Sequence, residues 1–445
     1  MQHRVGFTSA WRKIKSFFLR IFYRAKAENL IKKLLQLVRI KPVSIQKAFG
    51  TRSFFLSFLH FFGKYIQNNL IDKNTVLRYN YYTKNNSAEE KNYMNFNEHL
   101  SKKRIAVPTP DDVVDEFGMC RFGTFESEFP NMNFLKVNRP SVLPNCLNKT
   151  RLTLWEATEI NFDNVILLTA VCDMALFGTA LTVLYDKRTK KCTSWQEMFP
   201  ASKACIAPNL INSSETVSKG KKVKLNYVNN FQRGEAIVSG YATDKKNGAI
   251  DYRVKLTRVS KPSIVNIPFD ENRPLYSQKD LFSVEGYLEY NGERHVANSM
   301  TTAIIDDHRG YYPRNAHYDW VTTMGKREID GREQFFGFNL TRNQSINQDD
   351  YNENLIWFEG NSTLLTPVIF KHENDKLWHV VDEYGMVDLY FDIGDEFLMK
   401  VTTGIINIDY HITFGSLKGY VCDPDGNKYI LDGMVGIGED KTLKF

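Results

Sequence analysis

The sequence lacks the short motifs that mark most nucleotide-dependent and hydrolytic enzymes. Its 445 residues contain no P-loop, no G-x-G-x-x-G between a strand and a helix, no H-E-x-x-H and no G-x-S-x-G nucleophile elbow. The six cysteines are scattered, and no two of them have the C-x-x-C spacing of a redox motif or of half a zinc site. The apolar stretch at 54–62 has nine residues, whereas a helix needs roughly 20 to cross a bilayer. From these absences we expect no cofactor and no recognisable metal site.

Most of the chain carries no excess of positive charge, although the formal net charge of the whole sequence is +7. Residues 1–75 hold 15 Lys and Arg against Glu28 and Asp72, whereas the remaining residues hold 43 basic and 49 acidic groups. Folds that bind nucleic acid present a basic face. The mildly acidic body therefore predicts no nucleic-acid partner.

Residues 1–75 are predicted to form a helical, basic arm. Apolar residues recur at spacings of three and four from Trp11 onward, and Pro42 marks a helix end. Helices of this kind lie in the membrane interface, so we expect a cytoplasmic protein held peripherally at an anionic membrane. Packing of the arm on the body and import into an organelle are the alternatives. The residues expected to contact the membrane are Trp11, Lys13, Lys15, Phe18, Arg20, Phe22 and Arg24.

After the arm, the pattern is that of β-strands. Apolar and polar residues alternate at 250–257 and at 221–228, and turn sequences at 245–248, 290–293 and 423–426 are typical of hairpins. Regular alternation indicates sheets with one wet and one dry face, as in sandwiches and barrels. A chain of this length exceeds a single core, so we predict a mostly β body in two halves, 76–270 and 271–445, with Pro262 and Pro268 at the crossover. Further strands are expected at 165–171, 180–185, 364–370 and 405–414.

Polar residues that can carry chemistry gather at 304–325. On a strand, His317 and Asp319 share one face and Trp320 lies on the other. A neutral histidine beside a carboxylate is suited to proton transfer, although a buried structural network explains the same residues. A metal site would need further ligands that the sequence does not identify.

A second mixed patch spans 336–343 and 351–360. It sets Asn339, Glu353 and Asn354 among bulky apolar residues such as Trp357. Polar groups inside an apolar barrel need partners, so these side chains either hold one another or meet a ligand.

Four patterns together carry a resemblance to a known family. They are D-x-x-R-G-x-x-P-R-x-x-x-x-x-W at 306–320, F-G-F-N-L at 336–340, N-E-N-L-I-W-F-E-G at 352–360, and G-x-x-x-G-Y-V-x-D-x-x-G at 415–426. The chain resembles an uncharacterised domain-of-unknown-function family, distantly similar to hydroxyneurosporene synthase (carotenoid 1,2-hydratase) and other double-lipocalin proteins. The resemblance covers roughly residues 75–445 and implies two consecutive lipocalin-like antiparallel barrels with an apolar cavity.

The resemblance also implies two functions of different classes. The first is binding or carriage of a hydrophobic, lipid-like ligand, and the alternative is a cofactor-free hydratase or isomerase acting on an apolar isoprenoid or polyene. In the hydratase branch a His and a Trp stand two residues apart on one strand, whereas Trp320 follows His317 by three and faces the other side. We therefore take His317 and Asp319 as catalytic candidates without assigning the acid and the base. The ligand-binding candidates are Asp306, Arg314, Trp320, Phe336, Phe338, Asn339, Glu353, Asn354 and Trp357.

Overall fold

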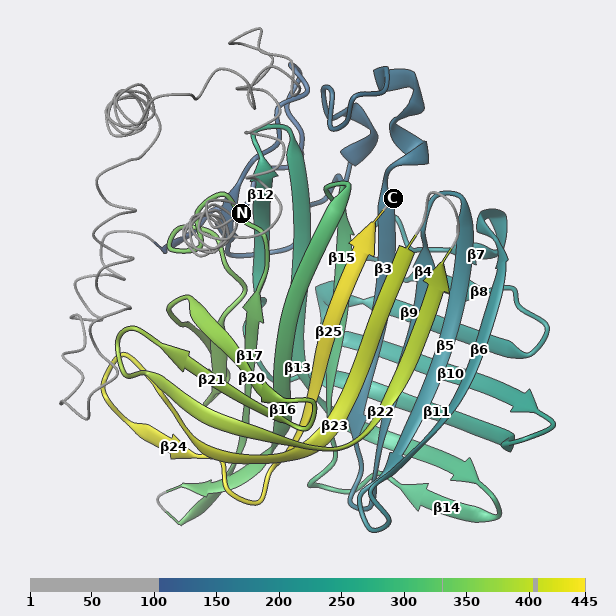
Figure 1. Ribbon diagram of the computed structural model, residues 1–445, viewed down its shortest axis with the longest axis vertical. Helices are drawn as coiled ribbons and strands as arrows, with labels where there is room; N and C mark the ends of the chain where they lie inside the picture. The colour runs from purple at the N-terminus through teal and green to yellow at the C-terminus, as the bar shows by residue number, and fades with distance from the viewer. Residues whose placement is uncertain (1–103, 330, 403–406, 445) are drawn as a thin grey trace, which may run out of the picture. The chain divides into compact units, whose positions relative to one another are not determined.

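The computed structural model describes residues 104–329, 331–402 and 407–444 (Figure 1). They belong to one compact unit, residues 92–445. Within these ranges no helix has the length and apolarity that a membrane span requires. The seven membrane-contact candidates between Trp11 and Arg24 lie outside the described residues, so that interpretation stays a prediction.

The first sheet has 15 strands, in the order β6-β5-β4-β3-β15-β13-β11-β10-β9-β8-β7, with β1, β2, β12 and β14 paired off this path. All its ladders are antiparallel except that between β1 and β2. The sheet curls almost into a barrel, but no ladder among the described residues joins β6 to β7. Its strands are β1 Ala106–Val107, β2 Gly123–Phe125, β3 Thr153–Asn161, β4 Val165–Asp173, β5 Phe177–Asp186, β6 Lys191–Pro200, β7 Ala204–Cys205, β8 Ser214–Ser218, β9 Val223–Asn230, β10 Glu235–Asp244, β11 Gly248–Arg258, β12 Ile264–Asp270, β13 Arg273–Tyr290, β14 Glu293–Val296 and β15 Thr302–Gly310.

The second sheet has 10 strands, in the order β19-β18-β17-β16-β25-β23-β22-β21-β20, with β24 paired to β23. It is antiparallel and curls about halfway to a barrel (Figure 1). The described helices are short 3-10 turns, η1 Phe134–Lys136, η2 Asn145–Thr150, η3 Ala201–Lys203 and η4 Phe231–Arg233. The strands are β16 Asn315–Ile329, β17 Arg332–Arg342, β18 Leu355–Phe358, β19 Asn361–Leu364, β20 Val368–Asn374, β21 Leu377–Asp382, β22 Val387–Thr402, β23 Asn407–Cys422, β24 Lys428–Ile430 and β25 Val435–Lys444.

The mostly β fold and the alternation that predicted it are confirmed. In β11 Ile250 and every second residue up to Leu256 are buried, while the residues between them are exposed. The three predicted hairpin turns connect β10 to β11, β13 to β14 and β23 to β24. The expected strand at 364–370 is instead divided into β19 and β20, because Pro367 cannot donate to a ladder.

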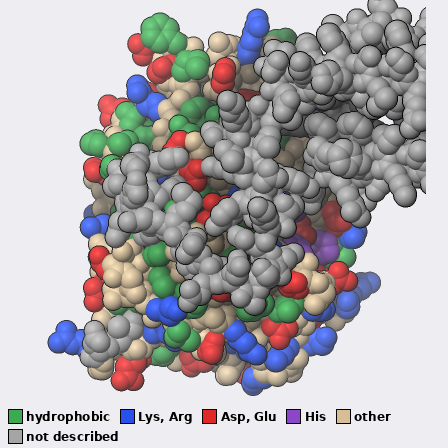
Figure 2. All heavy atoms as spheres, turned by 60° about the vertical axis from the view of Figure 1, so that its left-hand side comes forward, with side chains coloured by type: hydrophobic (Ala, Val, Ile, Leu, Met, Phe, Trp, Pro, Cys, Tyr) green, Lys and Arg blue, Asp and Glu red, His purple; other side chains and the backbone are tan. Residues whose placement is uncertain are grey.

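The apolar residues form separate cores, and one of them joins the two sheets. The first sheet encloses a core with Trp195, and the second sheet encloses one with Phe391. Between the sheets a third core contains Trp155 and Trp320, and across it Tyr185 of β5 stacks on Phe414 of β23 with ring centroids 5.1 Å apart. Over the face visible in Figure 2, basic and acidic side chains are interspersed.

The change from the first sheet to the second falls at residues 311–314, not at the predicted 270/271. Pro262 and Pro268 do not mark a crossover. Pro268 lies inside β12, which pairs with β13 through an irregular register next to that residue. Proline is tolerated where strand pairing is irregular, so Pro268 fits inside β12 and does not indicate a boundary between the two halves.

Candidate active site

Buried charged residues meet between the two sheets. Ser277 and Lys279 on β13 stand directly opposite His308 and Asp306 on β15 in the antiparallel register. Residues two apart on a strand share a face, so all four side chains point to the same side. Glu353, which precedes β18 of the second sheet, completes the group. We call these five residues the inter-sheet cluster.

The side chains of the inter-sheet cluster are within hydrogen-bonding or ion-pair distance of one another. Glu353 Oε2 lies 2.8 Å from Lys279 Nζ and 3.0 Å from Ser277 Oγ. His308 Nε2 lies 2.8 Å from Ser277 Oγ, 3.1 Å from Lys279 Nζ and 3.3 Å from an oxygen of Asp306. Each of the four ionisable side chains is at most 10% exposed. Charges as dry as these interact far more strongly than surface pairs.

Mutual attraction fixes the charge state of Lys279 and Glu353. Burial disfavours the ammonium of Lys279, but Asp306 and Glu353 outweigh burial and raise the pKa of Lys279 above its usual range. Burial also disfavours the carboxylate of Glu353, but Lys279 and His308 outweigh it and lower the pKa of Glu353 well below its usual range. Lys279 is therefore a permanent cation and hydrogen-bond donor rather than a base.

Polar residues of the second sheet hold Glu353 in place. The Asn339 side chain donates to the backbone carbonyl of Glu353 at 2.9 Å, and Asn343 donates to its carboxylate at 3.3 Å. Trp320 Nε1 in turn donates to Asn339 Oδ1 at 2.6 Å. Lys279 Nζ lies 5.6 Å from the centroid of the Trp320 ring, within the range of a cation–π contact.

A small cavity opens beside the inter-sheet cluster. It offers about 20 Å³ to water, which is room for about one water molecule. It is lined by Lys279, Asp306, His308 and Glu353 of the cluster together with Phe269, Leu275, Tyr312 and Trp320. The Tyr312 hydroxyl and His308 Nδ1 are buried and have no hydrogen-bond partner among the described residues. Buried polar atoms are usually paired, so these two are available to a ligand or to water.

A second set of ionisable side chains continues from the cavity wall. Glu439 lines the cavity and accepts hydrogen bonds from Tyr318 at 3.0 Å and from Tyr410. The Lys441 ammonium lies 4.4 Å from the Trp155 ring centroid and 4.3 Å from that of Tyr410. Burial raises the pKa of Glu439 and lowers that of Lys441, so both charges are held less firmly than those of Lys279 and Glu353.

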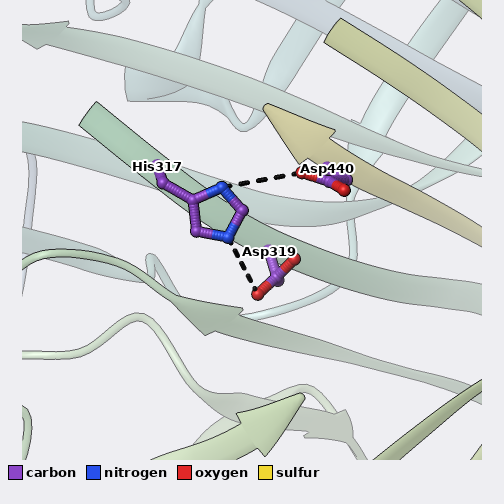
Figure 3. Close-up of side chains that lie close together, drawn as sticks. All are labelled: His317, Asp319 and Asp440. Atoms are coloured by element: carbon purple, nitrogen blue, oxygen red, sulfur yellow. Dashed lines mark ion pairs between the residues drawn. The ribbon is translucent and has the colours of Figure 1, made fainter. Parts of the chain in front are cut away.

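The predicted pair His317 and Asp319 does lie together, but on the other face of β16. Trp320 belongs to the core between the sheets, whereas Val321 belongs to the second sheet's own core. Asp319 shares the face of Val321 and meets His317 with 3.4 Å between Nε2 and Oδ2. Figure 3 shows Asp440 beside the pair. His317 reaches the rim of the cavity, but its side chain is 48% exposed.

The structure brings only some of the ligand-binding candidates together. Asp306, Trp320 and Glu353 line the cavity. Asn339 does not line it but bonds to Trp320 and to the backbone of Glu353, and Trp357 lies in the surrounding core. Phe336 and Phe338 are fully buried in the second sheet's own core. Asn354 bonds to the backbone of Thr341 and Thr366 and is structural in its contacts, and Arg314 is exposed in the segment between the sheets.

Sequence reasoning missed Lys279 and did not nominate His308, although it singled out the run around His308. Lys279 belongs to S-Q-K-D at 277–280, where four consecutive polar residues in β13 are all buried. Such a run looks like a turn, because the sequence does not reveal that both faces of a strand are covered. The apolar residues that flank it, Leu275 and Leu281, were the available signal.

Comparison with solved structures gives distant similarities. Kievitone hydratase from Nectria haematococca has 10% identity and a TM-score of 0.36, covering 77% of this chain and 98% of its own. CghA with Sch210972 has 7% identity and a TM-score of 0.41, covering 76% and 98%. An AttH protein from Nitrosomonas europaea has 14% identity and a TM-score of 0.38, covering 66% and 93%.

Sequence comparison identifies the family directly. No curated protein matches the chain. A family model described as Domain of unknown function (DUF2804) matches residues 104–445, which include all the described residues. The predicted resemblance to a domain-of-unknown-function family is thus confirmed, and the chain belongs to the DUF2804 family.

Proposed function

We propose that the inter-sheet cluster is the catalytic centre of an acid–base enzyme, a hydratase or isomerase. Its substrate would be an apolar unsaturated molecule with a carbonyl group. The observation that carries this proposal is the cavity itself, where four ionisable side chains at most 10% exposed lie beside an unpaired tyrosine hydroxyl. Dry sites with preorganised charges are where proton transfer and oxyanion stabilisation are most effective.

The geometry supports a distinct role for each group. Lys279, a fixed ammonium, would donate to the carbonyl oxygen and stabilise the enolate that forms. Because the Ser277 hydroxyl donates to Glu353 Oε2, it can accept a hydrogen bond from His308 Nε2. With its proton on Nε2, the His308 ring would keep the unpaired Nδ1 free to act as the base. Burial raises the pKa of Tyr312 well above its usual range, so its hydroxyl stays protonated and can act as a donor.

In the hydration reaction, the water oxygen bonds to one carbon of the double bond and its proton passes to His308. The other carbon takes a proton from the Tyr312 hydroxyl, which His308 then restores. In isomerisation, the proton that His308 removes from one carbon returns to another. Both sequences conserve protons and need no change of oxidation state.

Aromatic rings around the cavity match an apolar substrate. Trp155 lies with its ring centroid 4.7 Å from that of His308 and 6.0 Å from that of Tyr312, and Phe269 packs on Tyr312 at 5.7 Å. A cavity of about 20 Å³ holds water rather than a whole substrate. Substrate binding must therefore displace side chains at the rim, where His317 and Gln344 lie.

The charged side chains in the wall of this cavity favour the enzyme over simple carriage. A carrier of a lipid-like ligand needs a pocket lined mainly by apolar groups. A buried lysine, histidine and two carboxylates in its wall would only raise the cost of holding an apolar ligand.

The test is proton exchange into candidate substrates. The protein would be incubated in D2O with apolar enones and polyenes, and deuterium incorporation followed by mass spectrometry. We expect incorporation that falls at least about 100-fold in His308→Gln, the size of a typical general-base contribution. His379→Gln is the matched control, since His379 pairs with Asp388 away from the cavity. Equal exchange in the wild type and in His308→Gln would overturn the proposal.

A further inference from the structure

Two histidines and two aspartates form a closed ring on the face of β16 that bears Asp319 and Val321. Asp319 on β16 stands directly opposite Asp440 on β25. His317 bridges them, with 3.4 Å from Nε2 to Asp319 and 3.6 Å from Nδ1 to Asp440. His372 on β20 bridges them a second time, at 2.9 Å from Nε2 to Asp319 and 3.9 Å from Nδ1 to Asp440. Figure 3 shows three of these side chains converging.

Neutral histidines do not satisfy this ring. A neutral imidazole carries one N–H, so one carboxylate of each bridge would face a lone pair. The two carboxylates, as a like-charged pair on opposed strands, also repel each other. The ring is therefore balanced in one of two ways, by an extra proton on each histidine or by a cation between the four side chains.

We propose that His317, Asp319, His372 and Asp440 bind one divalent transition-metal ion, and that Zn²⁺ matches them best. Two imidazoles and two carboxylates are ligands that Zn²⁺ takes in tetrahedral sites. Bonds of about 2.0–2.2 Å separate neighbouring ligand atoms by roughly 3.3–3.5 Å. The nitrogens next to Asp319, Nε2 of His317 and Nε2 of His372, lie 3.4 and 2.9 Å from its oxygens. One ligand atom each from His317, Asp319 and Asp440 already lies within 4.8 Å of the others.

Neighbouring groups prepare the histidines as ligands. Thr442 lies opposite His317 in the register, and its Oγ1 is 3.2 Å from Nδ1. A proton on Nδ1 donated to Thr442 leaves Nε2, the nitrogen next to Asp319, free for a metal. The ring of His372 stacks on Trp378 with centroids 4.7 Å apart, which restricts its orientation. Outer contacts of this kind orient metal ligands.

The site is open to ions from solvent. The side chains of His317, His372 and Asp440 are 48%, 34% and 32% exposed, whereas that of Asp319 is 10% exposed. In the space-filling view histidine side chains reach the surface beside acidic ones (Figure 2). A metal can thus enter without unfolding, and this separates the site from the closed inter-sheet cluster on the other face.

The experiment titrates EDTA-treated, dialysed full-length protein with Zn²⁺ by calorimetry and with Co²⁺ by visible absorption. We expect one equivalent of each ion and the intense absorption of tetrahedral Co²⁺. In His317→Gln and His372→Gln the affinity should fall more than about 100-fold, beyond the 10–100-fold that loss of an outer contact costs. His379→Gln is the control, because His379 meets a single carboxylate, Asp388, at 2.8 Å, and should bind as the wild type does.

Two results would overturn the proposal. One is the absence of stoichiometric Zn²⁺ and Co²⁺ binding by the wild type, which would leave protons as the counter-charge of the ring. The other is unchanged affinity in His372→Gln, with the fold verified by circular dichroism, which would place any bound ion elsewhere. Because the readout is metal binding, neither result depends on the enzyme proposal.

Discussion

Lys279 is the residue whose loss should test the inter-sheet cluster most directly. Lys279→Met keeps the length and apolar stem of the side chain but removes the ammonium between Asp306 and Glu353. Those contacts are 3.4 and 2.8 Å long, and all three side chains are at most 10% exposed. Breaking a buried pair by removing one partner costs about 3–5 kcal/mol, because a charge is left uncompensated. The total stability of a domain is about 5–15 kcal/mol, so we expect a large loss.

The pH dependence gives the sign of the effect. The pKa of Glu353 is lowered in the folded protein, so its stabilising contribution is present above the unfolded pKa of about 4.3 and is lost as pH falls through the folded value. Lys279→Met removes the cause of that lowering, and burial then raises the pKa of Glu353. The variant's deficit should therefore be largest at neutral pH and shrink as pH falls through the raised pKa of Glu353, where this carboxylate takes up a proton.

The assay is urea unfolding followed by tryptophan fluorescence at several pH values. The double variant Lys279→Met/Glu353→Gln should recover part of the loss, because it removes a charge that the single variant leaves unpaired. A deficit below about 1 kcal/mol at pH 7, the value of an exposed ion pair, would refute the reasoning. The cluster would then be wet, and the basis for proton chemistry in a dry cavity would disappear.

Three further predictions follow from other parts of the chain. Tyr312→Phe should not lower stability and should raise it by about 1 kcal/mol, because it removes a buried unpaired hydroxyl, yet it should suppress deuterium exchange; a loss of stability would show that the hydroxyl is structural. The pKa values of His317 and His372 are raised, first by hydrogen bonding to Asp319, so the stability that their protonated forms contribute to the metal-free protein should be lost as pH rises through those pKa values. Zn²⁺ at 100 times its Kd should add about 2.7 kcal/mol to the free energy of unfolding, measured in thermal melts. Each basic residue near an anionic surface contributes about 1 kcal/mol to membrane binding. Changing four basic residues of the arm to glutamine should therefore lower the affinity for anionic liposomes, measured by sedimentation, on the order of 1,000-fold; unchanged sedimentation would exclude the arm as anchor. These four are Lys13, Lys15, Arg20 and Arg24.

The elements with one wet face were predictable from sequence. In β11 the alternation of apolar and polar residues matches burial at each position from Ile250 to Thr257, because a period of two reports directly which side faces water. The hairpin at 423–426 was also predictable, because its turn requires a positive φ that glycine adopts readily. Gly426 has φ 84° in the structure. Both features are local, so neighbouring residues determine them.

The centre of the molecule was not predictable for the opposite reason. Strand β13 is buried continuously from Pro274 to Phe282. One face meets the segment at 113–137 through Tyr276 and the first sheet's core through Phe282, and the other face meets the second sheet. Alternation disappears when both faces are dry. The sequence around Lys279 then resembles that of a polar turn, although these residues are buried in the strand.

Long-range pairing limited the prediction of the site formed by His317, Asp319, His372 and Asp440. His317 and Asp319 were recognised as a pair because they stand two residues apart on one strand. Asp440 and His372 join them only through the pairing of β16 with β25 and the curl that carries β20 back over the sheet. The sequence alone therefore identifies two of the proposed metal ligands, His317 and Asp319, and the fold adds the other two.

The two sites differ because β16 has two unlike faces. One face bears Trp320 and closes on the inter-sheet cluster, whereas the other bears Asp319 and opens through the half-exposed His317. Proton transfer gains from dryness, since exclusion of water strengthens the fixed charges that act on the substrate. Metal uptake instead requires an entry path and ligands that can lose protons to solvent. Strand β16 meets both requirements, because successive side chains of a strand point to opposite faces. One of its faces is buried between the two sheets, and the other is partly exposed to solvent. This explains why the adjacent residues 319 and 320 belong to different sites, and why His317, which touches the rim of the cavity from the open face, is the residue through which the two could influence each other.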